Sequence, residues 1–247
     1  MTIVPEFTTR GKDDPWAHRK GEPRYFALLW TLYLLASALL TVFSIRSVGL
    51  PTQEQFLLGG RSMTLMCALG VCPLWPMVRL SQIRAPKPIR AAWQDAMILT
   101  IPSCSVILPI TLLTGWTLQV SFALCLMLAV WAFVSGGLIA LGSGYESRKA
   151  RLASMALAWA LSLGAPIAVW AGTSSGFLDV ESRLGDLSLL LSPVSAIFVL
   201  SAPEPGAVYS FQVEPRAWRW LAAPALLGLA LWAIAWSRGR GSTSRGV

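Results

Sequence analysis

The side chains able to do chemistry are few, and their types and spacing argue against a catalytic centre. His18 is the only histidine among the 247 residues, and it lies in a charged amino-terminal segment. The triplet Gly142-Ser143-Gly144 resembles part of a serine-protease motif. A nucleophilic serine needs a histidine base, however, and no apolar stretch contains one. We therefore expect that the chain is not an enzyme.

The cysteines also lack the pattern of a metal or redox site. All lie inside apolar stretches, and the closest pair is five residues apart rather than the three of a CxxC motif. A membrane haem would need axial ligands, usually histidine, and the sequence contains no Walker-type phosphate loop. We expect no cofactor and no metal, and simple apolar packing for Cys67, Cys72, Cys104 and Cys125.

The composition predicts that membrane-spanning helices hold these side chains. Hydrophobic residues make up 55% of the chain and charged residues 13%, against about 25% charged in soluble domains. The apolar residues form long unbroken runs, which indicates an all-α, polytopic membrane bundle. The basic residues behind the net charge of +8 lie between these runs. We assign them to topology and to anionic headgroups of the lipid bilayer, and not to nucleic acid.

Six apolar runs suit helices that cross about 30 Å of hydrocarbon. They form a transmembrane domain over residues 25–236, between an amino-terminal segment, 1–24, and a carboxy-terminal tail, 237–247. The first run is too long for the apolar part of a removable signal peptide, so we expect it to be retained. The predicted spans are 25–45, 62–78, 96–113, 117–141, 152–172 and 220–236.

One further segment, 184–202, is ambiguous. It is apolar but contains Asp186 and Pro193, so it suits either a seventh span or an external re-entrant hairpin. Basic residues gather before span one, between spans two and three, between spans four and five, and after span six. Basic segments favour the cytoplasm, which places both termini inside and favours six crossings over seven. Without a targeting sequence, we expect a bacterial plasma (inner) membrane.

The predicted spans hold essentially no ionisable residue at bilayer depth. Asp95 lies at the entrance of the third span, and Gln119 in the fourth is neutral. Proton- and ion-coupled carriers need titratable or coordinating groups at depth. The sequence therefore disfavours an ion-driven pump.

Small residues recur at four-residue spacing in the fourth and fifth spans. Such stripes let helix backbones approach closely. They suit packing inside one subunit best, and a dimer seam or a sliding surface is the alternative. The residues are Gly136, Ala140, Gly144, Ala156, Ala160, Gly164, Ala168 and Gly172.

The segment between spans two and three is basic and mildly amphipathic. It suits a solvated loop that sets topology, and it also suits a docking surface for a cytoplasmic partner or acidic lipids. The candidate docking residues are Arg79, Arg84, Lys87, Arg90 and Asp95.

This layout resembles the membrane subunit of a type-two ATP-binding-cassette exporter. Such permeases have an amino-terminal interfacial helix, six spans, a coupling element between spans two and three, and a re-entrant element between spans five and six. The corresponding slots are 10–24, 79–95 and 184–202, and the run Leu191-Ser192-Pro193-Val194-Ser195-Ala196 resembles the start of the re-entrant element. Many members carry an acidic residue in the coupling segment, which is basic here until Asp95.

The resemblance implies a permease that pairs with a copy or a relative and is driven by a separate cytoplasmic ATPase docked on 79–95. The main alternative is a non-catalytic membrane anchor or accessory subunit of a larger complex, which needs only packing faces. An enzyme acting on lipid headgroups is a third, weaker alternative, because the available acids are scattered along the chain.

Overall fold

The computed structural model describes residues 23–44, 52–82, 87–144, 147–174, 189–203 and 211–243. Within these ranges the chain is helical and contains no strand, which confirms the all-α prediction. The elements are α1 (Pro23–Ser44), α2 (Gln53–Leu69), the π-helical turn η2 (Gly70–Leu74), α3 (Trp75–Ser81), α4 (Pro88–Thr114), α5 (Leu118–Gly144), α6 (Arg148–Ser174), α8 (Pro193–Leu200) and α9 (Pro215–Thr243).

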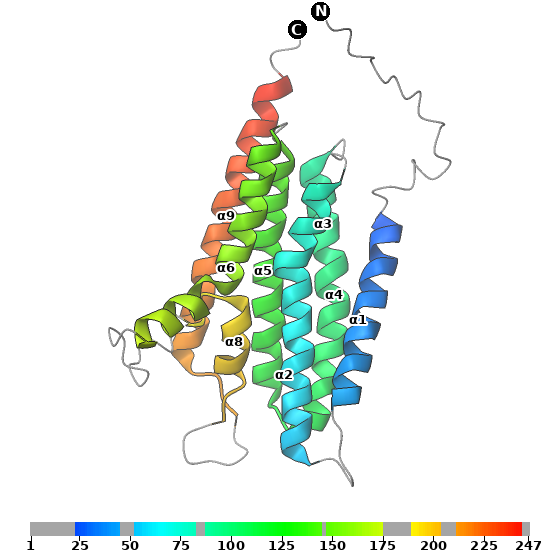
Figure 1. Cartoon of the computed structure of the whole chain (residues 1–247), viewed down its shortest axis with the longest axis vertical. Helices are drawn as coiled ribbons and strands as arrows, with labels where there is room; N and C mark the ends of the chain where they lie inside the picture. Colours follow the sequence, from blue (N-terminus) through cyan, green and yellow to red (C-terminus); the bar gives the residue numbers. More distant parts are fainter. Residues whose placement is uncertain are drawn as a thin grey trace, which may run out of the picture.

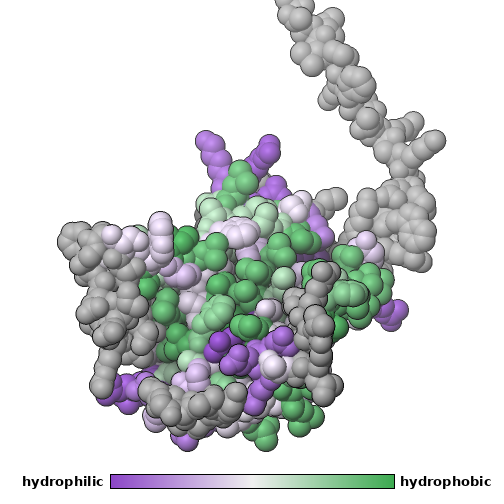
Figure 2. Space-filling model, turned by 60° about the horizontal axis from the view of Figure 1, so that its bottom comes forward, coloured by the Kyte–Doolittle hydropathy of each residue, from purple (hydrophilic) through white to green (hydrophobic). Residues whose placement is uncertain are grey.

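Six helices of the described part are long and apolar enough to cross a membrane, with α2, η2 and α3 acting as one. Apolar side chains cover much of the outer surface in Figure 2, and polar ones gather in small groups. Large apolar residues such as Leu112, which is 87% exposed, point away from the bundle. An exposed apolar surface of this extent requires lipid around it. The chain is therefore a multi-pass membrane protein.

Helix α5 lies at the centre of the bundle and packs most extensively against α4 and α9. It is apolar on all sides, as expected for a helix surrounded by other helices. An aromatic cluster joins the three helices: the rings of Phe133 and Trp232 stack at 5.6 Å, and Trp93 meets both edge-on. The Trp232 indole also donates to the Phe133 carbonyl at 2.8 Å.

Helix ends follow local signals in the sequence. Thr52 and Gln55 form a reciprocal capping box that starts α2. Gly115 has φ +73° and ends α4 in the left-handed conformation that glycine adopts without strain. Pro88 begins α4, where its missing N–H costs nothing. The short link at Gly115 makes α4 and α5 the antiparallel pair that the sequence predicts.

The second span differs most from its prediction. The helix begins at Gln53 instead of residue 62, and it contains a π-helical turn around Pro73. A π turn accommodates the carbonyl that proline leaves without a donor. The fourth span begins one residue later than predicted, and the other spans extend up to eight residues beyond their apolar runs, because polar residues continue the helices.

Helix α1 docks on this π turn. Trp30 and Tyr33 stack at 5.0 Å and lie over Gly70, where an added Cβ would stand 2.6 Å from the Trp30 ring. The Trp30 indole donates to the Leu99 carbonyl at 3.1 Å, and the Tyr33 hydroxyl donates to the Met66 carbonyl at 2.7 Å. Both aromatic residues therefore bury their rings and still satisfy their polar atoms.

The described part of the ambiguous segment 184–202 is short. Ser192 caps α8 at the Val194 N–H, Pro193 occupies the first turn, and the helix ends at Leu200. Its eight residues span about 12 Å, too little to cross a bilayer. Helix α8 packs between α2, α5 and α6, while Asp186 lies outside the described residues. The amino end of α1 and the carboxy end of α9 lie at the same end of the bundle, as six crossings require (Figure 1).

The two small-residue stripes have different surroundings. On α5, Gly136 packs against Trp232, and Ala140 is buried, whereas Gly144 has no atom within 4 Å of an added Cβ. On α6, the stripe faces outward: Gly164 also has nothing within 4 Å, and the alanines of the stripe are exposed. Those alanines are Ala156, Ala160 and Ala168. The α5 stripe thus serves internal packing. The α6 stripe forms a surface that another helix could approach closely, and the described chain does not cover it.

Substituting glycine with alanine separates these two environments. At Gly137, an added Cβ would lie 2.8 Å from Leu231 Cβ, so Gly137→Ala should cost about 1–3 kcal/mol through overpacking. Gly164→Ala is the matched control, and it should stabilise the helix by up to about 1 kcal/mol. Thermal unfolding of both purified variants in the same detergent checks this. Equal shifts in the melting midpoint would contradict the packing described here.

Single cysteines test the number of crossings. Introduced at the exposed positions Arg24 and Ser237, with the native cysteines replaced, they should react with a membrane-impermeant maleimide from one side of the membrane. A cysteine at exposed Gln53 should react only from the other side. Labelling of positions 24 and 237 from opposite sides would mean an odd number of crossings and would overturn the six-span topology.

Candidate functional site

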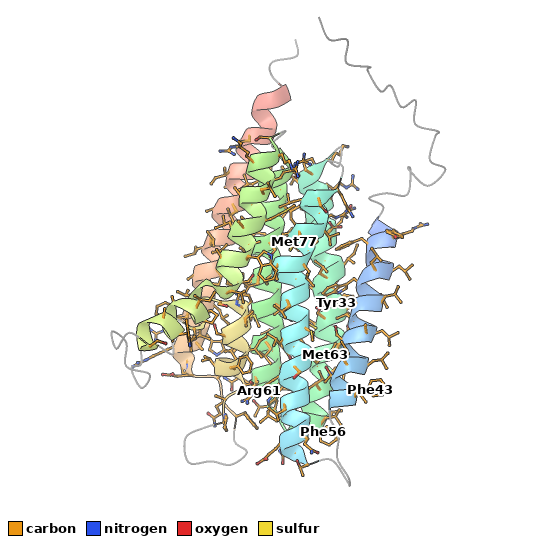
Figure 3. All side chains as sticks on the ribbon, viewed as in Figure 1. Tyr33, Phe43, Phe56, Arg61, Met63 and Met77 are labelled. Carbon is orange, nitrogen blue, oxygen red and sulfur yellow. The ribbon has the colours of Figure 1, made fainter. Side chains whose placement is uncertain are left out.

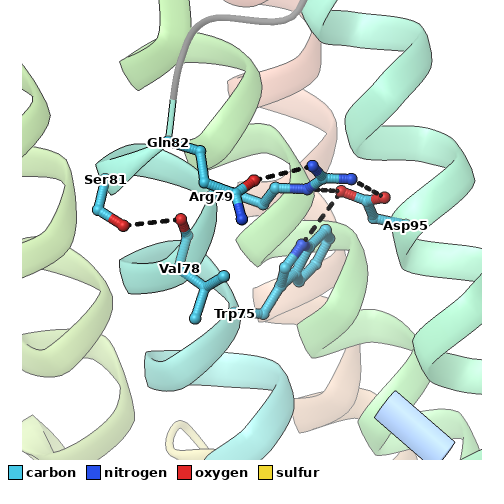
Figure 4. Close-up of polar contacts among 6 residues, drawn as sticks. All are labelled: Trp75, Val78, Arg79, Ser81, Gln82 and Asp95. Atoms are coloured by element: carbon cyan, nitrogen blue, oxygen red, sulfur yellow. Dashed lines mark hydrogen bonds and ion pairs between the residues drawn. The ribbon is translucent and has the colours of Figure 1, made fainter. Parts of the chain in front are cut away.

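A buried ion pair lies where α3 and α4 approach their connection. The Arg79 guanidinium binds the Asp95 carboxylate with both prongs: Nε donates to Oδ2, and Nη2 donates to Oδ1 at 2.6 Å (Figure 4). The Asp95 side chain is 1% exposed and that of Arg79 is 10% exposed. A fork-to-fork pair of this kind fixes the relative position of its two helices.

Neighbouring side chains complete the shell of this ion pair. The Trp75 indole donates to Asp95 Oδ2 at 3.4 Å, and Arg79 Nη1 donates to Gln82 Oε1 at 3.1 Å. The guanidinium carbon lies 4.8 Å from the centre of the Phe26 ring, a cation–π contact from α1. The pair therefore ties α1, α3 and α4 together.

The local sequence explains why these groups meet. Trp75 and Arg79 are four residues apart on α3, so they lie on one helical face. The π turn at Gly70–Leu74 contains one residue more per turn than an α-helix and so rotates α3 relative to α2. The Trp75 ring also lies against α5, 3.4 Å from where a Cβ on Gly136 would be. A glycine there lets the ring fill the space beside the carboxylate.

The five predicted docking residues have different environments. Arg79 and Asp95 neutralise each other inside the bundle, so their charges are not presented to a partner. Lys87 and Arg90, at the start of α4, are exposed and remain available. Arg84 lies outside the described residues. The surface available for docking is therefore basic, and the acidic residue of this segment has a structural role.

A second polar site occupies the opposite half of the bundle. Arg61 of α2 donates from Nε to Ser201 Oγ at 2.8 Å and from Nη2 to the Ser201 carbonyl at 2.7 Å, at the end of α8. At the start of α8, the Ser192 hydroxyl donates to the Ser162 carbonyl of α6. Figure 3 shows Arg61 on the side of α2 nearest α8. Polar bonds at both ends therefore fix this short helix.

These two sites show that charged side chains lie within the helices that contain the second and third predicted spans. Arg61 follows Gln53 by eight residues, about 12 Å along α2, and Asp95 follows Pro88 by seven, about 10 Å along α4. Runs of apolar residues begin only after these positions, so the sequence placed both at span ends. The helices continue through them because each charged group has a polar partner on another helix. Leu57 and Leu58 ahead of Arg61 were the available signal.

The cysteines are free thiols in the structure, and the described residues contain no group of three His, Cys, Asp or Glu able to hold a metal ion. Comparison of the chain with protein-family models, with curated proteins and with solved structures found no match. The resemblance to exporter permeases therefore stays a prediction.

Removing one member of the ion pair should be much worse than removing both. Asp95→Asn leaves the Arg79 charge without its partner in a 10% exposed position, at a cost of about 3–5 kcal/mol. The double variant Arg79→Met with Asp95→Leu replaces the pair with apolar groups and should recover most of that loss. Unfolding of the purified variants in detergent measures both. If the loss of stability in the double variant equalled the sum of the losses in Arg79→Met and in Asp95→Leu, each made alone, the coupling between the two side chains would be refuted.

Proposed function

We propose that this chain is the membrane-spanning permease subunit of an ATP-binding-cassette type transporter, driven by a separate cytoplasmic ATPase. The observation behind the proposal is that an ion pair holds α3 and α4 together next to the connection that joins them. This connection presents Lys87 and Arg90 outward, and directly beneath them the Arg79–Asp95 pair locks the two helices together. A force applied to this connection would therefore move α3 and α4 as one unit, together with α1 through Phe26.

The element between α6 and α9 supports the same proposal. Helix α8 is eight residues long and lies in the half of the bundle away from the α3–α4 connection. It contacts α2, α5 and α6, so a movement of these helices changes the surface against which α8 packs. A short helix held by side-chain hydrogen bonds can follow such a shift more readily than a full span, because few contacts must be remade.

The orientation follows from charge. The α3–α4 connection carries Lys87 and Arg90, and α6 begins with Arg148, Lys149 and Arg151 at the same end of the bundle. Short basic connections favour the cytoplasmic side, which supports a cytoplasmic amino terminus in a bacterial plasma membrane. In this orientation the docking surface meets the compartment that contains ATP.

A second membrane subunit, either a copy or a relative, would complete the transporter. The outward stripe on α6, with Ala160 and Gly164, suits close packing against another helix.

The alternative function is a non-catalytic anchor or accessory subunit of a larger membrane complex. The buried ion pair would then serve stability alone, and the basic surface of 79–95 would bind lipid or a non-ATPase partner. The two functions differ in what copurifies with the chain.

Charge reversal at the exposed connection separates them. The intact chain, isolated from its native membrane at low salt, should copurify with a Walker-motif ATPase. Lys87→Glu with Arg90→Glu should abolish this, because a partner surface that binds these basic residues must be acidic and would then face like charges. Arg216→Glu with Arg219→Glu, on exposed residues at the other end, is the matched control and should retain the ATPase. A stable assembly that contains no ATPase would instead identify an accessory subunit.

A further inference from the structure

Arg61 differs from the other arginines with described side-chain contacts in carrying a charge without a counter-charge. Arg79 pairs with Asp95, and Arg216 lies 3.7 Å from Glu214. No carboxylate of the described residues lies within 4 Å of Arg61. Its two side-chain hydrogen bonds both go to Ser201, which is neutral. The positive charge of Arg61 is thus held in place, and no residue that the structure describes neutralises it.

The hydrogen bonds use only part of the guanidinium. Nε and one N–H of Nη2 point to Ser201, and the Ser201 hydroxyl itself donates to the Ile197 carbonyl at 2.7 Å. A guanidinium has five N–H donors, so three remain, including both on Nη1. No described residue accepts from them. Two of them, one on Nη1 and one on Nη2, are parallel and form a planar edge that matches two oxygens of an anion.

The surroundings make an unpaired charge costly. Leu57, Leu58, Met63 and Leu65 flank Arg61 on α2, and the residue lies about 12 Å inside that helix. A charged group among such apolar neighbours is costly unless something pairs with it. The carboxy end of α8 supplies at most about half a negative charge through its dipole. Roughly half of the positive charge therefore remains to attract an anion.

Topology does not account for this arginine either. Arg61 lies in the half of the bundle away from the basic α3–α4 and α5–α6 connections (Figure 3). Basic residues in that half do not contribute to a cytoplasmic excess. Its position is explained by the contact with α8 and by whatever occupies its free edge.

We propose that Arg61 is the centre of an anion site that binds a phosphate group through the free edge of its guanidinium, while the end of α8 holds the other edge. Among the described residues Arg61 is partly exposed and its neighbour Leu58 is 61% exposed, so a ligand can reach Arg61 from the apolar outer surface. The headgroup of a phosphate-bearing lipid reaches such a position directly, and free phosphate could reach it from the water. The site stands independently of the proposed transport function.

The test compares phosphate-bearing and phosphate-free ligands on the purified full chain in an uncharged detergent. Phosphatidic acid should raise the melting midpoint in a saturable way, and diacylglycerol with the same acyl chains should not. In Arg61→Gln the apparent dissociation constant for phosphatidic acid should rise about 10- to 150-fold, the value of a charged hydrogen-bonded pair. Arg216→Gln, at an exposed arginine near the start of α9, is the control and should match the wild type.

Inorganic phosphate distinguishes the source of the ligand. An Arg61-dependent rise in midpoint with inorganic phosphate would support a site for soluble phosphate, and its absence beside a phosphatidic acid effect would support a lipid headgroup. Arg61→Lys serves if Arg61→Gln does not fold, because it keeps the charge and loses the planar edge, and it should bind several-fold more weakly. Wild-type affinity in both variants, or no stabilisation of the wild type by either phosphate compound, would overturn the proposal.

Discussion

The arrangement of this protein depends on pairing charged groups where water is scarce. The Arg79–Asp95 pair joins the ends of α3 and α4 and reaches α1 through the Phe26 ring. Neither charge would be tolerated alone at its depth, since an unpaired buried ion costs several kcal/mol, so the two helices are held at one separation and register. The connection between α3 and α4 is consequently attached to two helices that are fixed relative to each other. A docking element needs such rigid support if it is to transmit movement into the membrane.

The π turn links this rigid support to the rest of the bundle. Pro73 would break a regular α-helix, and the wider turn absorbs it while turning Trp75 and Arg79 toward Asp95. The same turn presents Gly70 to α1, and the stacked Trp30 and Tyr33 pack against it. A single irregularity in one helix therefore determines both how α1 docks and where the ion pair forms. Similar turns in helices often lie at functional sites, and this one adjoins the proposed docking surface.

In the other half of the bundle, a polar partner again holds a charged side chain, but no described residue neutralises its charge. Arg61 anchors α8 through Ser201, yet no described residue supplies the negative charge that Asp95 supplies to Arg79. Helix α8 is too short to cross and is seated by hydrogen bonds at both of its ends. Within the described residues, the α3–α4 connection at one end and α8 near the other are the places where we propose that a partner or ligand acts.

The sequence by itself determined the fold class, the number of long apolar helices and the tight α4–α5 turn, because apolar runs near 20 residues and a glycine stop are local properties. Helix α8, which begins at Pro193, lies within the predicted element 184–202, and Asp186 of that element lies outside the described residues. Only the tertiary structure showed that Asp95 and Arg61 lie inside helices, that Gly136 packs inward and that Ala160 faces outward. The reason is physical, because the hydropathy of a residue depends only on that residue's own transfer free energy. Whether a charge is tolerated within a helix, or a small residue forms a packing contact, depends instead on which groups a distant helix places beside it.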